Sequence, residues 1–514
     1  MKLERTKNTA RNAAYGYLSR LILMIFPFLT RGLFIRLLGS EYLGLNGLFS
    51  SILTVLNMSE LGFSSAIVVH MYRAIAADDG KTINALLNYY RRIYHIVGTV
   101  ILCAGCAVIP FLPRLIRGSY PADINLTAVY LVFLLDTVLS YFLFAHYNSL
   151  LSAFQRDDLI TKVNLLVKLL MYALQIGILL VVRNFYVYLL IMPLCTVARN
   201  LITCFAARRA FPEYMPAGKL PKSTTEDIGT MVKGAMIGRV AAVCRNSFDS
   251  VFISMFLGLT ATAIYGNYYY IMNTISCLLL VLTGAATGGA GNSVALESQE
   301  KNHADMMRMN FLYMWAAGWC AICMLCLYQP FMKLWAGEQM LLPVPTMVLF
   351  CVYLYVLKNG DVMSIYSGTR GLFWEQRYIT IAEAVGNITL NYFLGKYFGI
   401  TGILLATIIT MLGINFLCGS RVIFQHYFTH FSANQYILWH LKRGAVTLAV
   451  GAVTYWVCGF VTISGIPGLI VTGLICVVLP NLLFFLIYRK TPSYQEAVPW
   501  VLEKIHLLTS KNAR

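Results

Sequence analysis

The feature that most constrains the fold of this chain is a series of apolar blocks, each about 20 residues long, which is the length of a membrane-spanning helix. Because backbone groups in lipid must form hydrogen bonds internally, and the blocks lack the alternation of barrel strands, we expect helices. The predicted fold class is an all-α integral membrane protein with fourteen transmembrane helices. The expected spans are 14–38, 43–70, 93–112, 125–152, 159–182, 185–207, 229–257, 261–290, 307–328, 342–366, 378–398, 401–424, 441–462 and 467–488.

The distribution of basic residues predicts how the chain is oriented in the membrane. Only 12% of the 514 residues are charged, and the formal net charge is +18. The basic residues lie mostly between apolar blocks, so membrane topology explains them and we expect no nucleic-acid partner. If the N-terminus is cytoplasmic, inside segments hold 27 of the 40 lysines and arginines, and outside loops hold five. We therefore expect a multi-pass protein with both termini in the cytoplasm.

Two parts of the chain resemble each other at a constant offset of 219 residues. Spans one to six then correspond to spans seven to twelve, and because each repeat has an even number of spans, the repeats run parallel. The alternative is that common residues match by chance. One ungapped offset that holds along the repeat makes chance the weaker explanation. The matched pairs include Arg20 and Arg239, Gly39 and Gly258, Gly47 and Gly266, Tyr94 and Tyr313, and Gly118 and Gly337.

The repeat predicts the domain organisation. Each repeat forms a six-helix lobe, and a proline-containing segment connects the two lobes on the cytoplasmic side. Two further helices and an amphipathic cytoplasmic tail complete the chain. The expected boundaries are 1–210 and 229–425 for the lobes, 211–228 for the linker, 426–488 for the extra helices and 489–514 for the tail.

Charged residues inside the apolar blocks are the candidate functional residues. An ionised side chain in a bilayer is costly, so it faces a protein interior or a water-filled cavity. Arg20, Arg31, Arg239 and Arg245 predict a cation-lined cavity between the repeats. The alternative is a set of internal ion pairs that fix helix register. The acidic candidates, which could couple transport to an ion gradient, are Glu60, Asp249, Asp136 and Asp361.

Other motifs give little support for catalysis or metal binding. Cys103 and Cys106, and likewise Cys320, Cys323 and Cys326, have metal-like spacing, but they lie in apolar blocks without nearby histidine or acidic ligands. We interpret them as small buried apolar residues. No nucleophile elbow or metal-binding helix motif occurs. We therefore expect no enzyme activity, no cofactor and no metal.

The segment 36–67, RLLGSEYLGLNGLFSSILTVLNMSELGFSSAI, resembles the polysaccharide flippases of the multidrug/oligosaccharidyl-lipid/polysaccharide exporter superfamily. It has the family's turn between the first two spans and a second span ending in Glu-Leu-Gly-Phe. The paired lobes and two extra helices fit as well. The resemblance implies a flippase in the bacterial cytoplasmic (inner) membrane, which moves undecaprenyl-diphosphate-linked repeat units for capsule, O-antigen or exopolysaccharide by alternating access.

This interpretation makes the four arginines the candidate binding site for the diphosphate, because guanidinium groups bind such oxygens bidentately. Asn46, Asn57, Asn267 and Tyr268 are candidates for contact with the sugars. The expected partners are the lipid-linked oligosaccharide, membrane lipid, a polysaccharide polymerase and glycosyltransferases, with the protein itself a monomer. Two alternatives remain. An ion-coupled multidrug exporter predicts an acidic, aromatic site, whereas a membrane enzyme predicts long outside loops or a mid-membrane histidine.

Overall fold

The computed structural model describes residues 22–57, 63–118 and 120–511, and within these ranges the chain forms helices and no strand. This confirms the predicted all-α fold. Judged by length and composition, seven helices among the described residues can cross a membrane, or up to nine if each bent pair forms one span. The total of fourteen spans stays a prediction.

The chain divides into two compact units, residues 1–263 and 264–514. The first unit begins, in its described part, with a helix over 22–37. Its further helices are α2 (Ser40–Leu56), α3 (Phe63–Ala76), α4 (Gly80–Val108), the 3₁₀ helix η2 (Ile109–Leu115), α5 (Leu126–Phe142), α6 (His146–Ala153), α7 (Asp157–Val181), α8 (Phe185–Ala210) and α9 (Lys222–Leu257).

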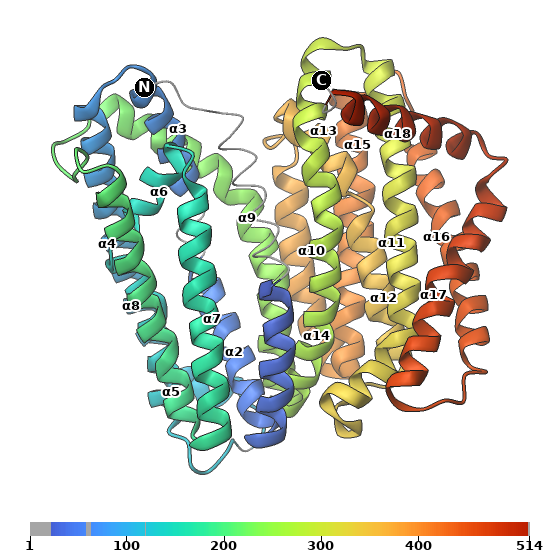
Figure 1. Cartoon of the computed structure of the whole chain (residues 1–514), viewed down its shortest axis with the longest axis horizontal. Coiled ribbons are helices and arrows are strands. Elements are labelled where there is room, and N and C mark those ends of the chain that lie inside the picture. The colour runs from blue at the N-terminus through green and yellow to red at the C-terminus, as the bar shows by residue number, and fades with distance from the viewer. Residues whose placement is uncertain (1–21, 58–62, 119, 512–514) are drawn as a thin grey trace. The chain divides into compact units, whose positions relative to one another are not determined.

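Long apolar helices pack side by side in the first unit (Figure 1). The helix α8 packs against α5 and α7, α4 packs against α3 and α5, and α2 packs against α9. Between α2 and α5 the Phe49 ring meets the edges of Tyr130 and Phe133, at centroid distances of 5.4 and 5.8 Å. All three rings are buried, so aromatic packing and removal of apolar area both stabilise this contact.

Two glycines explain the close approach of α2 to the end of α9. A Cβ atom on Gly44 would lie 2.1 Å from the carbonyl oxygen of Leu259, so only glycine fits there. Gly258 ends α9 with a φ of 89°, and a Cβ atom there would lie 2.7 Å from the carbonyl oxygen of Arg117. The backbone N–H of Arg117 donates to the carbonyl oxygen of Ser254 at 3.0 Å.

The glycines matched by the sequence repeat share their backbone conformation. Gly39 and Gly258 have φ values of 108° and 89°, and Gly118 and Gly337 have φ values of 85° and 97°. These conformations belong to the region that favours glycine. Corresponding turns of the two repeats are therefore alike. Because α9 packs against α2, however, it lies in the first compact unit, whereas the repeat assigns it to the second lobe.

The segment between α8 and α9 is held against the start of α4. The Asn88 amide donates to the carbonyl oxygen of Gly218 at 2.7 Å, and Asn84 Oδ1 accepts from the backbone N–H of Met215 at 2.9 Å. Burial, with smaller effects of Glu213 and Asp78, raises the pKa of Tyr214. The helix α9 begins at Lys222, inside the predicted linker 211–228.

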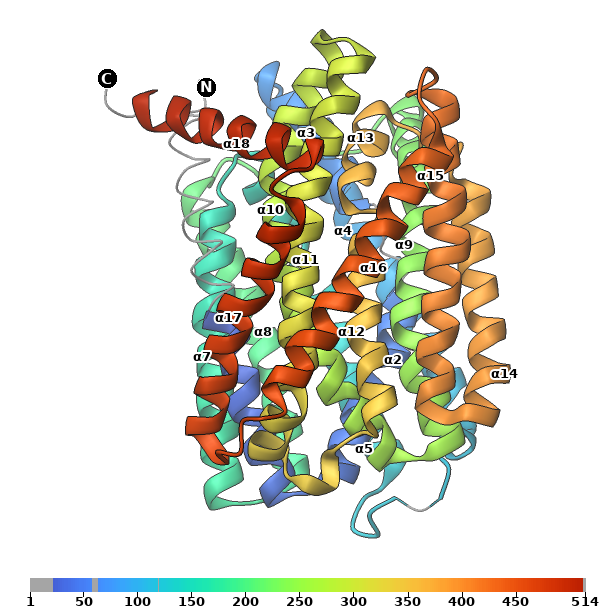
Figure 2. The same ribbon diagram turned by 90° about the vertical axis from the view of Figure 1, so that its right-hand side faces the viewer.

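In the second unit α11 is central, because it packs against α12, α16, α17 and α18. The helix α18 crosses the ends of the long helices, while α16 and α17 lie beside α11 (Figures 1 and 2). The helices are α10 (Leu259–Leu296), α11 (Gln299–Ala336), η3 (Glu338–Met340), α12 (Val344–Lys358), α13 (Asp361–Arg370), α14 (Arg377–Thr410), the π-helical η4 (Met411–Phe416), α15 (Leu417–His426), α16 (Ala433–Cys458), α17 (Gly465–Tyr488) and α18 (Pro492–Lys511).

Some predicted spans contain a bend or a turn. In the span predicted at 125–152, the chain bends by 49° between α5 and α6, and Phe144 at this bend has a φ of 56°. The span predicted at 342–366 corresponds to α12 and α13, which together form one candidate span, Val344–Arg370, with a turn at residues 359–360. The helix α14 contains a further break at Gly399, with a φ of 59°, between the spans predicted at 378–398 and 401–424.

Candidate functional site

The structure describes only part of the predicted arginine cavity. Arg20 lies outside the described residues. Arg239 and Arg245 lie on α9, where the structure describes the backbone but not these two side chains. Arg31 is half-buried in the helix over 22–37, close enough to Tyr188 of α8 for an electrostatic interaction. A site formed by all four arginines therefore stays a prediction.

The residues predicted to meet sugars divide between two environments. Asn46 on α2 and Asn57, which directly follows α2, are half-buried, and the Tyr141 hydroxyl donates to Asn57 Oδ1 at 3.3 Å. Asn267 and Tyr268 are fully buried on α10. The Tyr268 hydroxyl donates to Gln329 Oε1 at 2.9 Å and accepts from the backbone N–H of Leu342 at 3.2 Å, so it fixes the turn before α12.

The acidic candidates have different surroundings. Asp136 of α5 accepts a 2.6 Å hydrogen bond from the Thr196 hydroxyl of α8. Asp249 is fully buried on α9, and Glu60 lies outside the described residues.

Asp361 lies in a buried polar cluster built by three helices of the second unit. Its Oδ2 is 2.9 Å from the Lys358 ammonium and accepts a 2.5 Å hydrogen bond from the Tyr313 hydroxyl of α11. The Lys358 side chain is only 1% exposed and that of Asp361 is 20% exposed. A buried charge that loses its partner is strongly destabilising, so Lys358 and Asp361 depend on each other.

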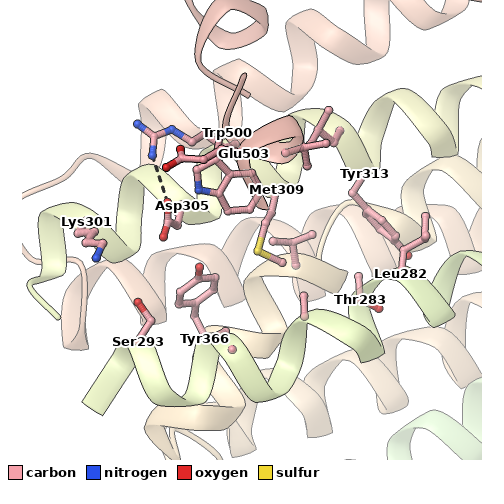
Figure 3. A pocket seen from close by; sticks show the side chains of 17 residues that line it. Leu282, Thr283, Ser293, Lys301, Asp305, Met309, Tyr313, Tyr366, Trp500 and Glu503 are labelled. Carbon is pink, nitrogen blue, oxygen red and sulfur yellow. Dashed lines mark hydrogen bonds and ion pairs between the residues drawn. The ribbon is translucent and has the colours of Figure 1, made fainter. Parts of the chain in front are cut away.

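A cavity of about 790 Å³ lies between α10, α11, α13 and α18 of the second unit. Asp305, Trp500 and Glu503 lie together at one end of it, and Thr283 and Tyr313 lie at the other (Figure 3). Its lining residues are Leu282, Thr283, Ala286, Gly289, Ala290, Ser293, Lys301, Asp305, Arg308, Met309, Leu312, Tyr313, Val362, Tyr366, Trp500, Val501 and Glu503.

Charged side chains at this cavity form a network between α11 and α18. Arg308 Nη1 is 3.1 Å from Asp305 Oδ1, and Arg308 Nε is 3.7 Å from Glu496 Oε2 of α18. Lys301 pairs with Glu297 at 2.7 Å. Tyr313 lines the inner end of the same cavity and donates to Asp361, so the buried cluster adjoins the cavity.

The sequence pattern predicts no cavity at this place. Lys301 and Arg308 belong to the basic residues whose distribution predicts only membrane orientation. Their separation of seven residues, with Asp305 between them, places all three on one helix face, which was the available signal. Nothing in the sequence indicated that α18 would bring Trp500 and Glu503 to that face.

A second cavity, of about 340 Å³, lies between α11, α12, η4 and α16 and is almost entirely apolar. Its few polar lining residues are Tyr355, Asn359, His440 and Thr447. His440 is 2% exposed, and neither of its ring nitrogens has a hydrogen-bond partner among the described residues. The remaining lining consists largely of residues such as Ile322, Leu325, Val352 and Leu448.

Solved structures with this fold are membrane transporters. The lipid II flippase MurJ, in an inward closed conformation, matches with a TM-score of 0.66 at 12% identity, over 93% of this chain and 98% of that one. An inward-facing multidrug resistance transporter of the MATE family, in the MOP superfamily, matches with a TM-score of 0.61 at 14% identity, over 84% and 99%. A MOP superfamily transporter from Pyrococcus furiosus matches with a TM-score of 0.53 at 14% identity, over 86% and 96%.

The chain thus has the fold of the MOP superfamily, whose matching members are transporters and a flippase rather than enzymes. Residues 9–287 match the model of the family described as polysaccharide biosynthesis protein, and the chain belongs to that family. No curated protein matches the chain. The family match agrees with the resemblance derived from segment 36–67, which lies inside the matched residues.

Proposed function

We propose that this protein is a flippase that moves undecaprenyl-diphosphate-linked oligosaccharide across the bacterial cytoplasmic membrane for capsule, O-antigen or exopolysaccharide synthesis. The observation that carries the proposal is the match of residues 9–287 to the polysaccharide biosynthesis family. The MOP transporter fold supports it, because a lipid-linked intermediate made inside the cell needs a carrier to reach an outside polymerase.

The diphosphate is proposed to bind Arg20, Arg31, Arg239 and Arg245. Guanidinium groups stay ionised and offer paired donors to phosphate oxygens. The half-buried place of Arg31 is compatible with this role, since the side chain is neither fully enclosed nor on an open surface. A carrier of organic cations would need an acidic site instead, which makes the multidrug exporter the weaker alternative.

The cavity between α10, α11, α13 and α18 suits part of an amphiphilic substrate. Carboxylates and guanidinium groups at one end accept and donate hydrogen bonds to sugar hydroxyls, as Asp305, Glu503 and Arg308 would. The rings of Tyr366 and Trp500 offer apolar faces with polar edges. Sugars of the repeat unit are therefore proposed to contact this cavity, besides Asn46, Asn57, Asn267 and Tyr268.

The isoprenoid tail is proposed to stay in apolar surroundings, in lipid or beside the two extra helices. The apolar cavity formed by α11, α12, η4 and α16 supports this placement, because its lining offers little to a polar group. Separating a polar binding region from an apolar one lets one protein hold both ends of an amphiphile.

Movement is proposed to follow alternating access, with lobes 1–210 and 229–425 rocking about a cavity lined by both repeats. Among the carboxylates Glu60, Asp249, Asp136 and Asp361, the coupling role is best supported for Asp361. It accepts a hydrogen bond from Tyr313, which lines the substrate cavity, so it adjoins that cavity. A monomer that acts between glycosyltransferases and a polymerase completes the proposal.

Complementation of a strain that lacks its own flippase tests the proposed function. Single alanine variants of Arg20, Arg31, Arg239 and Arg245 should lose polymer export, whereas lysine variants should retain part of it, since lysine keeps the charge without the paired donors. Expression of each variant is checked in membranes. If all four alanine variants export polymer at the parent level, the arginines are not the binding site.

A further inference from the structure

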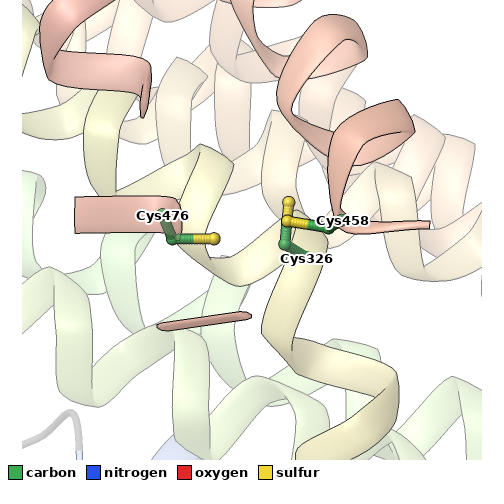
Figure 4. A group of neighbouring side chains, drawn as sticks. All are labelled: Cys326, Cys458 and Cys476. Carbon is green, nitrogen blue, oxygen red and sulfur yellow. The ribbon is translucent and has the colours of Figure 1, made fainter. Parts of the chain in front are cut away.

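Three cysteines from different helices converge in the second unit. Cys326 belongs to α11, Cys458 is the last residue of α16, and Cys476 belongs to α17. Their Sγ atoms all lie within 4.8 Å of one another, and the sulfur of Cys476 points toward the other two (Figure 4). Cys326 and Cys476 are buried, and Cys458 is half-buried.

The sequence could not show this cluster. In the sequence, Cys326 has metal-like spacing to Cys320 and Cys323, which lie on the same helix. In the structure its neighbouring cysteines are Cys458 and Cys476, which belong to two other helices and lie about 130 and 150 residues later in the chain. A cysteine that only fills a small gap in the core has no need of another cysteine beside it. Packing alone therefore does not explain why three sulfur atoms lie next to one another.

The spacing of the sulfurs is close to that of a three-coordinate ion. Metal–sulfur bonds of about 2.3 Å in a trigonal arrangement place the sulfurs about 4 Å apart. The three thiols would therefore bind such an ion with side-chain movements of about 1 Å or less. Each thiol that becomes a ligand loses its proton to solvent or to a carrier of the ion.

The donor set selects the type of ion. Thiolates are soft ligands that favour Cu(I), Zn(II) and iron–sulfur clusters. Among the described residues no histidine or carboxylate joins the three sulfurs, so the group lacks the fourth ligand of a structural zinc site. Cys323 lies one turn before Cys326 and its side chain also interacts with that of Cys476, but its Sγ lies outside the group whose sulfurs are all within 4.8 Å of one another.

The surroundings protect a metal–thiolate group from water. Cys326 and Cys476 belong to an apolar cluster that includes Ile322, Val450 and Phe484. The Trp319 indole N–H donates to the carbonyl oxygen of Cys476 at 2.9 Å and fixes the backbone of α17 there. Burial among apolar side chains controls solvent access to a metal site.

We propose that Cys326, Cys458 and Cys476 form a site for a soft monovalent metal ion, Cu(I) or Ag(I), which links the two extra helices to α11. The inference does not rest on the proposed flippase function. Its consequence is structural, because one bound ion would join α11, α16 and α17.

Metal titration of the purified, reduced full-length protein tests the site. With Cu(I) in competition with a Cu(I) chelator, and with Ag(I) as a redox-inert probe, the parent should bind one ion per chain at this site. We expect metal affinity to fall by about 10- to 100-fold or more in each of the variants Cys326→Ser, Cys458→Ser and Cys476→Ser. Losing a residue that only hydrogen-bonds to a metal ligand already costs that much affinity, and these variants lose a ligand itself. The matched control is Cys103→Ser/Cys106→Ser, which removes an exposed pair on α4.

Thermal unfolding distinguishes a lost site from a lost fold. Ag(I) should raise the unfolding midpoint of the parent and of the α4 control, because it binds the folded state, and should leave the midpoint of each serine variant of the cluster unchanged. Monodisperse elution shows that a variant is folded. Equal ion binding by the parent and the triple serine variant would overturn the proposal. Binding of Zn(II) without Cu(I) or Ag(I), or of no ion, would also overturn it.

Discussion

At the scale of single residues, Gly44 is a position where even one added methyl group should destabilise the fold. Gly44→Ala places a Cβ atom against the Leu259 carbonyl oxygen and should cost about 1–3 kcal/mol through overpacking. Gly47→Ala on the same helix is the control, since the nearest atom there lies 3.6 Å away, in ordinary contact. Thermal unfolding of the purified variants measures the difference, and equal midpoints would contradict the close approach of the helices.

The buried ion pair makes a second prediction at this scale. Lys358→Met removes the cation beside Asp361 and should cost about 3–5 kcal/mol, because a buried carboxylate loses its partner. Adding Asp361→Asn should recover much of that loss. Lys333→Met is the control, because Lys333 and Glu338 form an exposed pair at 2.6 Å, and surface pairs contribute little. A double variant no more stable than the single one would refute this mutual dependence.

Residue spacing predicted some of these contacts and not others. Lys358 and Asp361 are three residues apart, which indicated proximity on a helix, and they do form an ion pair. The Tyr313 hydroxyl that completes the cluster comes from another helix, about 45 residues earlier. Such a partner depends on how helices are arranged, and local periodicity carries no information about that.

At the scale of elements, α18 contributes Trp500, Val501 and Glu503 to the lining of the larger cavity. Truncation after Thr491 should expose Ser293, which lines that cavity, without disturbing the opposite ends of the helices. With Ser293→Cys, a membrane-impermeant thiol reagent should then react faster in the truncated protein than in the full chain. The comparison uses membranes whose cytoplasmic face is accessible.

The matched control for that experiment is Ser464→Cys, which lies just before α17, at the end of that helix far from α18. Its labelling from the other face should not respond to the truncation. Equal labelling of Ser293→Cys with and without α18 would mean that this helix does not restrict the cavity.

Helix positions were predicted well, whereas the break between α5 and α6 was not. The predicted spans at 159–182 and 185–207 agree closely with α7 and α8, because apolar length directly reflects the thickness of a membrane. The break between α5 and α6 has no glycine or proline and rests on the left-handed conformation of Phe144. Tertiary packing imposes that conformation, so no local signal could indicate it.

At the scale of the whole molecule, the distribution of basic residues predicts cytoplasmic termini. Cysteines introduced at Ala217 and at Gln339 test this, since the first lies between α8 and α9 and the second in η3. An impermeant reagent added to intact cells should label the residue at 339 and miss the residue at 217. The opposite pattern would reverse the topology.

The measurement that most directly tests the account is translocation of a fluorescent undecaprenyl-diphosphate oligosaccharide in vesicles that contain only this protein. A membrane-impermeant quencher reports the fraction of labelled lipid in the outer leaflet. The account predicts that protein-containing vesicles expose inner-leaflet lipid to the quencher over time, and that Arg31→Ala slows the exchange more than Arg31→Lys. The contradicting result is that folded protein moves a labelled organic cation while the lipid-linked sugar exchanges no faster than in protein-free vesicles.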